Sequence, residues 1–176
     1  MRLPPTMPRI PALVPVLESA DHIDVKIVTG AVSLRAFLAA ALGDQPGWVT
    51  GLYRVRAVFV RTLGLRQERM PRGPRMIPDT VPMRPGTRYG PFTVRLAAED
   101  RYWVGEAKAS HLTATLAVIV EPLAGARRFY VVTVVHYHAW TGPVYFNVIR
   151  PFHRLVVGRM AAAGVHAPAL VVGTRR

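Results

Sequence analysis

Apolar and polar residues alternate along the second half of the chain in the pattern typical of β-strands. Turn-forming residues separate the alternating segments, as at Glu99-Asp100 and at Glu121–Gly125. Strands that follow one another through short turns predict an antiparallel meander. The strand centred on Val132 is apolar on both faces, so we expect it in the middle of the sheet. The four predicted strands are residues 92–98, 102–107, 112–120 and 128–138.

Helical spacing of apolar residues predicts three helices. Residues 34–42 form the first, with Ser33 as its N-cap and Gly43 as its C-terminal stop. Residues from about 46 to 63 form the second. Residues 144–162 form the last, and Pro151 should bend it because proline removes one backbone hydrogen bond. Its predicted apolar stripe consists of Tyr145, Val148, Ile149, Phe152, Leu155 and Val156.

Proline and glycine divide the rest of the chain. Residues 1–20 carry a proline every few positions, which predicts an extended arm packed over the body. Residues 22–28 alternate, with Ile23, Val25 and Ile27 on one face of a strand. Residues 66–91 hold six prolines and predict an irregular connection with at most a short edge strand near 76–81, or a flap over a pocket. The expected organisation is an arm at 1–20, one ligand-binding domain at 21–165 and a tail at 166–176.

Composition narrows the classes of function. A chain of 176 residues can bury a sizeable core, and its apolar residues never run for the ~20 positions that a membrane helix needs. The net charge is +13, but the arginines are scattered rather than clustered, so we expect no nucleic-acid partner. The absence of cysteine excludes disulfides, thiolate nucleophiles and cysteine-based metal sites. Prolines interrupt the N-terminal segment where a secretory signal would be apolar, which predicts a cytoplasmic protein.

Two histidines on the last predicted strand are candidates for a site. His136 and His138 share a strand face about 6–7 Å apart, a spacing that metal-binding pairs also use. A third ligand would have to come from His111, Glu106 or His153. The alternative is that both line the end of a strand as ordinary polar residues. Because no metal-binding signature accompanies them, we expect neither a metal nor another cofactor.

His153 and Glu106 are the candidates for acid–base chemistry. His153 borders the apolar stripe of the last helix, where it either caps the core edge or carries a proton in a pocket. Glu106 shares a strand face with Tyr102 and Val104; that face is expected to point outward, and an inward face would make Glu106 a base with a raised pKa. The chain has no Gly-x-Ser-x-Gly, Walker or dinucleotide motif, so hydrolase, kinase and dehydrogenase functions lack their usual support.

Three stretches resemble an uncharacterised bacterial family, domain of unknown function 2867. They are Pro46-Gly-Trp-Val with Leu52-Tyr-Arg-Val-Arg and Leu63-Gly-Leu, then Val134-Val-His-Tyr-His, and above all Gly142-Pro-Val-Tyr-Phe-Asn-Val-Ile-Arg-Pro-Phe-His-Arg154. The similarity covers roughly residues 15–163. It implies a helix-grip fold like that of START and polyketide-cyclase proteins, in which a seven-stranded sheet and a C-terminal helix enclose an apolar cavity. Tyr145, Pro151, Phe152 and His153 transfer as signature residues only.

These observations favour a domain that binds an apolar or aromatic small molecule between the sheet and the last helix. The expected ligand contacts are His136, His138, Tyr145, His153, Trp103 and Trp48. The alternative is a cofactor-independent cyclase or isomerase in which His153 or Glu106 moves a proton. Some members of the family resembled are fused to a nucleotide-binding domain, which adds a third alternative, an accessory module for such a partner. A second copy of the chain is a further candidate partner.

Overall fold

The computed structural model describes residues 4–43 and 77–166, and within them the chain forms one antiparallel sheet. Its six strands lie in the order β1-β6-β5-β4-β3-β2, so every strand from β2 to β6 pairs with its sequence neighbour and β1 adds to β6. The strands are β1 (His22–Gly30), β2 (Arg88–Tyr89), β3 (Phe92–Ala98), β4 (Tyr102–Lys108), β5 (Leu112–Leu123) and β6 (Ala126–Tyr137). This confirms the predicted meander. Strand β6 is an interior strand, flanked by β1 and β5, but it lies second from the edge rather than in the middle of the sheet.

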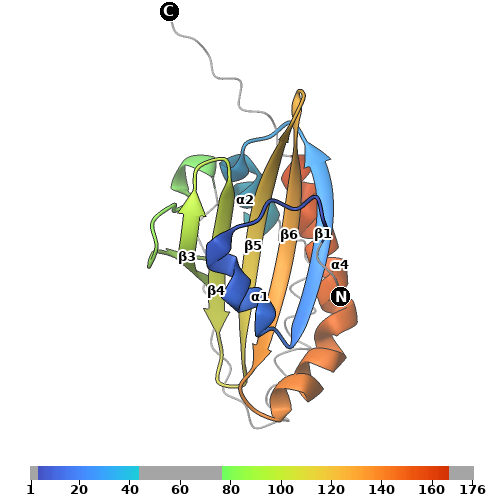
Figure 1. Cartoon of the computed structure of the whole chain (residues 1–176). Helices are drawn as coiled ribbons and strands as arrows, with labels where there is room; N and C mark the ends of the chain where they lie inside the picture. The colour runs from blue at the N-terminus through green and yellow to red at the C-terminus, as the bar shows by residue number, and fades with distance from the viewer. Residues whose placement is uncertain (1–3, 44–76, 167–176) are drawn as a thin grey trace, which may run out of the picture.

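Helices cover both faces of the sheet (Figure 1). The longest, α4 (Thr141–Val165), lies with α2 (Leu34–Gly43) on the face that we call the inner face. The short helices η1 (Pro11–Leu13) and α1 (Val14–Glu18) cross the opposite, outer face. A sheet with a long C-terminal helix packed along it is an α+β helix-grip fold, as expected.

The main core lies between the inner face and the two helices. Phe37 of α2 stacks on Phe129 of β6 with ring centroids 4.3 Å apart. Gly164 of α4 lies directly against the Phe37 ring, since a Cβ at this position would be 2.5 Å from it. Trp103 is fully buried, and its Nε1–H donates to the carbonyl oxygen of Pro82 at 3.1 Å. Close contact between α2, α4 and β6 therefore fixes the C-terminal half of α4.

Two side chains hold the N-terminus of α2. The N–H of Ala36 donates to Ser33 Oγ at 3.2 Å, which confirms Ser33 as the N-cap. The N–H of Leu34 donates to Asp100 Oδ1 at 3.0 Å. Asp100 lies in the tight β3–β4 turn with φ of 50°, a conformation that aspartate adopts more readily than most residues. The second cap thus comes from a distant turn, which ties α2 to the sheet.

The N-terminal segment is partly helical rather than extended. Prolines 11 and 15 stand in the first turns of η1 and α1, where the missing N–H costs no hydrogen bond. Leu13 is buried on the outer face against a second apolar cluster that includes Ile119 and Tyr130. The sheet therefore has an apolar layer on each side.

Other boundaries differ from those predicted. The predicted edge strand near 76–81 is wrong: residues 78–80 form a 3₁₀ turn, η2 (Pro78–Thr80), and the edge strand is β2. The hairpin joining β5 and β6 is tighter than expected, because β5 continues through Pro122 to Leu123. The predicted helix at 46–63, and Trp48 with it, lies outside the described residues.

Helix α4 buries a different face from the one predicted. Tyr145 and Phe146 are buried against the sheet, whereas Val148, Phe152 and Leu155 are exposed. The reason is position: α4 packs on α2 and on β1, the last strand of the sheet, so only one side of the helix is covered. Among the helices of the described ranges, none combines the length and apolar content required to cross a membrane.

Candidate functional site

Polar side chains gather on the inner face where α4 crosses β1. The alternation of β1 points Ile23, Val25 and Ile27 toward the outer face, because their partners on β6 belong to the outer apolar cluster. The intervening polar residues therefore face α4. We call the resulting group the inner polar cluster; it consists of His22, Asp24 and Lys26 of β1, Thr133 of β6 and His153 of α4.

Asp24 is the most buried charged residue of this cluster, with 5% of its surface exposed. Its Oδ2 lies 3.8 Å from Nζ of Lys26 and makes no hydrogen bond within the described residues. Thr133 stands directly across the strand pair, and its buried Oγ1 likewise has no hydrogen-bond partner in this part of the chain. Cross-strand neighbours on one face have Cβ atoms about 5 Å apart. Two directly paired residues thus each carry a buried oxygen without a hydrogen bond in this part of the chain.

The two histidines of the cluster both contact the ring of Phe146 of α4. The ring centroid of His22 is 4.7 Å from that of Phe146, and the centroid of His153 is 5.9 Å from it. Burial lowers the pKa of His153 below its usual 6.5, while the Asp24 charge acts to raise it. Burial also lowers the pKa of His22, and Arg150 adds to that effect. At neutral pH both imidazoles are therefore uncharged, able to accept a proton or a hydrogen bond.

Apolar side chains adjoin the cluster at the start of α4. Tyr145 and Phe146 pack with Val135 of β6 and Ile149 of α4 in a third apolar group on the inner face. The ring of Tyr145 meets the ring of His111 edge-on at 4.7 Å. The site therefore combines an apolar wall with hydrogen-bonding groups on β1 and β6.

The outer face holds three of the predicted site residues. His136 Nε2 is 3.1 Å from Ser19 Oγ, whose hydroxyl donates to the carbonyl oxygen of Pro15. His138 Nε2 is 2.7 Å from Thr113 Oγ1. Because Ser19 already donates elsewhere, His136 is the donor in that pair and does not act as a base toward Ser19. The structure does not bring these two histidines together with His153.

Glu106 also lies on the outer face, opposite Thr115 of β5. Its carboxylate is 3.1 Å from Nζ of Lys108 and 3.8 Å from Nε of Arg95. The sheet therefore separates Glu106 from α4 and His153.

Trp103 faces inward but lies in the main core rather than in the cluster. Its ring meets Tyr89 and Phe92 edge-on, each with centroids 6.1 Å apart. Trp48 lies outside the described residues. Tyr145 and His153 are thus the predicted site residues that lie along the same side of α4 as the inner polar cluster.

Alternation in the sequence could have indicated the three residues of β1 that the sequence analysis did not predict as site residues. His22, Asp24 and Lys26 alternate with apolar residues, which is usually interpreted as a solvent-facing side of a strand. Here the outer face is covered by the N-terminal segment and the polar side is covered by α4, so the usual assignment of faces fails. Thr133 gave no such signal, because it is one polar residue in an apolar strand.

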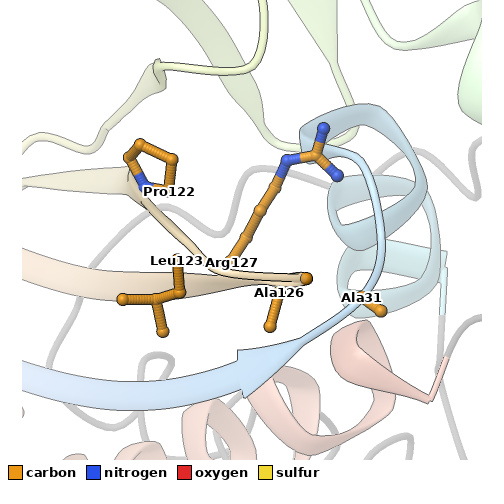
Figure 2. A pocket seen from close by; sticks show the side chains of 6 residues that line it. Ala31, Pro122, Leu123, Ala126 and Arg127 are labelled. Carbon is orange, nitrogen blue, oxygen red and sulfur yellow. The ribbon is translucent and has the colours of Figure 1, made fainter.

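A shallow depression lies at the other end of the sheet (Figure 2). Its volume is about 290 Å³, and Arg127 extends along it toward the loop before α2. The guanidinium donates to the carbonyl oxygen of Val32 at 3.0 Å and to Asp100 Oδ2 at 3.3 Å. Since Arg127 pairs with Gly30, this depression is about 26 Å along β1 from His22. It is therefore separate from the inner polar cluster. Its walls are Ala31, Pro122, Leu123, Gly125, Ala126 and Arg127.

Within residues 4–43 and 77–166, no three histidine or acidic side chains converge as metal ligands would. Hydrogen bonds and proton transfer are thus the chemistry that the inner polar cluster offers by itself.

Comparison with known families identifies the chain. The model of DUF2867, described as a protein of unknown function, matches residues 16–160. The chain belongs to the DUF2867 family. The match includes all the strands as well as α4 through Met160, and so takes in every residue of the inner polar cluster. No curated protein is significantly similar in sequence to this DUF2867 protein.

Three solved structures are similar to this chain at low sequence identity. The hypothetical protein jhp0584 of Helicobacter pylori is 14% identical, with a TM-score of 0.45, covering 94% of this chain and 96% of its own. The Mll3558 protein of Rhizobium loti is 11% identical, with a TM-score of 0.42, covering 81% and 96%. Ara h 8.0201 is 9% identical, with a TM-score of 0.39, covering 81% and 97%. None of these similarities transfers a function.

Proposed function

We propose that this DUF2867 protein binds a small molecule with an apolar or aromatic body between the sheet and α4, and that Asp24 and Thr133 bind the polar group of that molecule. The supporting observation is that two cross-strand neighbours each carry a buried oxygen, Asp24 Oδ2 and Thr133 Oγ1, that lacks a hydrogen bond within the described residues. An unsatisfied buried polar group costs roughly 1–3 kcal/mol. A ligand that supplied the missing hydrogen bonds would recover this free energy on binding.

The chemistry of these groups defines the polar part of the ligand. An ionised carboxylate only accepts hydrogen bonds, while a threonine hydroxyl both donates and accepts. The ligand should therefore carry an O–H or N–H donor for Asp24, and an oxygen or nitrogen near it for Thr133. Phe146 and Tyr145 offer the apolar contact for the rest of the molecule. An aromatic or aliphatic alcohol or amine fits this description.

Matched probes test the proposal. Binding of 2-naphthol and of 2-methoxynaphthalene, which lacks the donor, should be measured by calorimetry and by amide chemical shifts. We expect the naphthol to bind about tenfold or more tightly, because a hydrogen bond to a charged group contributes about 1.5–3 kcal/mol. Asp24→Asn and Thr133→Val should each reduce that preference. Glu106→Gln is the matched control, since it alters a carboxylate on the outer face.

Two results would contradict the proposal. The first is equal binding of the two probes to the natural protein. The second is chemical-shift changes that avoid β1 and the N-terminal half of α4.

A second candidate function is acid–base catalysis in the same place. It is favoured by the electrostatic coupling of Asp24 to a buried, neutral His153, since a carboxylate beside an imidazole supports its action as a base. A cyclase or isomerase of this kind would lose turnover in His153→Gln and keep it in Glu106→Gln. Turnover that survives His153→Gln would exclude His153 from the mechanism.

Other expectations from the sequence stay predictions. They are a single ligand-binding domain at 21–165, a cytoplasmic location, and a second copy or a nucleotide-binding protein as partner. Gel filtration and co-purification with the full chain would test the last two directly.

A further inference from the structure

The outward side of α4 carries a line of exposed apolar side chains. We call it the exposed ridge; its members are Val144, Val148, Phe152 and Leu155, which are 44–59% exposed. Trp140 precedes the helix and is 78% exposed. The spacing of four, four and three residues places the ridge along one side of the helix. Trp140 and the exposed ridge together extend about 22 Å along the helix axis, as far as Leu155. Apolar surface of this length on one helix marks a docking surface.

The charged side chains of α4 itself are all of one sign. Helix α4 contains no acidic residue, and Arg154 is exposed on it. The whole chain has a net charge of +13. Two copies meeting through this ridge would bring arginines of α4 close to one another without a carboxylate on either helix. The complementary surface is therefore anionic.

We propose that the exposed ridge of α4 docks this protein on an anionic lipid bilayer. A helix with tryptophan, phenylalanine and leucine on one side and arginines beside them is the pattern that lies in the bilayer interface. The residues of the ridge are exposed along one side of α4, which suits a broad planar surface. A partner helix would instead be expected to enter a groove. This inference does not depend on the proposed ligand site, because the two lie on different sides of α4.

Vesicle sedimentation tests the proposal with the full chain. We expect binding to vesicles of 70% phosphatidylcholine and 30% phosphatidylglycerol, and binding weakened at least severalfold with phosphatidylcholine alone or at high salt. The double substitution Val148→Gln/Leu155→Gln should weaken partitioning by roughly tenfold or more, because two inserted side chains are lost. Val14→Gln is the matched control: this residue is 42% exposed, but it lies on α1 across the sheet, so binding should not change.

A second measurement separates docking from misfolding. Brominated lipid should quench fluorescence in the natural protein, and the quenching should be lost in Trp140→Phe; circular dichroism should show all variants folded. Failure to bind anionic vesicles, or equal binding by the double variant, would overturn the proposal. So would self-association in solution that the double variant abolishes, because the ridge would then be a contact between copies.

Discussion

Asp24 and His153 illustrate how much a single buried charge constrains its neighbours. Asp24 is shielded from water on the inner face, and Nζ of Lys26 lies 3.8 Å from its Oδ2. Its field opposes the burial that drives His153 toward the neutral form. Burial is the larger effect on the pKa of His153, and His22 and Lys26 act in the same direction, so the neutral form is favoured despite the charge of Asp24.

The stability of the protein should depend on the protonation of His153. Its pKa is lowered in the folded state, so the unfolded chain takes up the proton first as pH falls through 6.5. Stability is thus fully present above that pH and declines below it until the folded pKa is reached. We expect urea unfolding at pH 7.5 and 5.5 to show this loss. In His153→Gln the loss should be smaller.

His22 provides an internal comparison for that experiment. Burial lowers its pKa too, so His22→Gln should also reduce the pH dependence, and the double variant should reduce it most. If His153→Gln retained the whole pH dependence, the assignment of this effect to His153 would be wrong.

At the scale of the element, the packing of α4 changes along its length, and the exposure of its side chains changes around its circumference. Its C-terminal half packs closely on α2, where Gly164 admits the ring of Phe37. Its outward side carries the exposed ridge. The apolar residues of α4 therefore lie on two sides of the helix, a narrow side that is buried and another that is exposed. This is why the stripe inferred from spacing alone mixed residues of both.

Two glycines of α4 should respond in opposite directions to the same substitution. A methyl group at Gly164 would lie 2.5 Å from Phe37, a buried ring that is stacked on Phe129 and cannot move aside. We expect Gly164→Ala to lower the free energy of unfolding by about 1–2 kcal/mol, since overpacking outweighs the helix propensity gained. Thermal or urea unfolding measures it.

Gly158 is the matched control within the same helix. Apart from the adjoining backbone of its own helix, no atom of the described residues lies within 4 Å of the position that its Cβ would occupy. Gly158→Ala should therefore raise the free energy of unfolding by up to about 1 kcal/mol. Equal effects of the two substitutions would contradict the packing described between α2 and α4.

At the scale of the whole molecule, the sheet separates two apolar layers. The inner layer is formed by α2, α4 and the sheet, and the outer layer by the N-terminal segment with Tyr130 and its neighbours. The hydroxyl of Tyr130 lies 2.7 Å from Glu121 Oε2 and 2.9 Å from Thr6 Oγ1, which ties the segment to β5 and β6. The N-terminal segment is accordingly part of the folded body.

Removing the apolar contact of that segment should destabilise the protein. Leu13 is 4% exposed, so Leu13→Ala should lower the free energy of unfolding by about 2–3 kcal/mol. Its neighbour Val14 is 42% exposed, and Val14→Ala should change stability by no more than about 0.5 kcal/mol. A small effect at Leu13 would show that the outer layer contributes little to folding.

The sequence by itself determined the secondary structure of most of the described chain. Alternation in β3, β4 and β6, the N-cap Ser33 and the stop at Gly43 are local signals, and each was confirmed within a few residues. The burial of both faces of β6 also followed from the sequence, because a strand that is apolar on both faces must be covered on both, whereas its place second from the edge did not. Local propensity and burial pattern favour the same secondary structure at these positions, so tertiary contacts with neighbouring elements do not change it.

Tertiary structure alone decided which faces are covered and what gathers between them. The inner polar cluster joins β1, β6 and α4, and its members are separated by more than 100 positions between Asp24 and Thr133 in the sequence. Periodicity gives the two sides of a strand or helix but not which side another element will cover. That depends on the order of strands and on where α4 crosses β1. For this reason the sequence predicted the fold, whereas the candidate site and the exposed ridge became visible only in three dimensions.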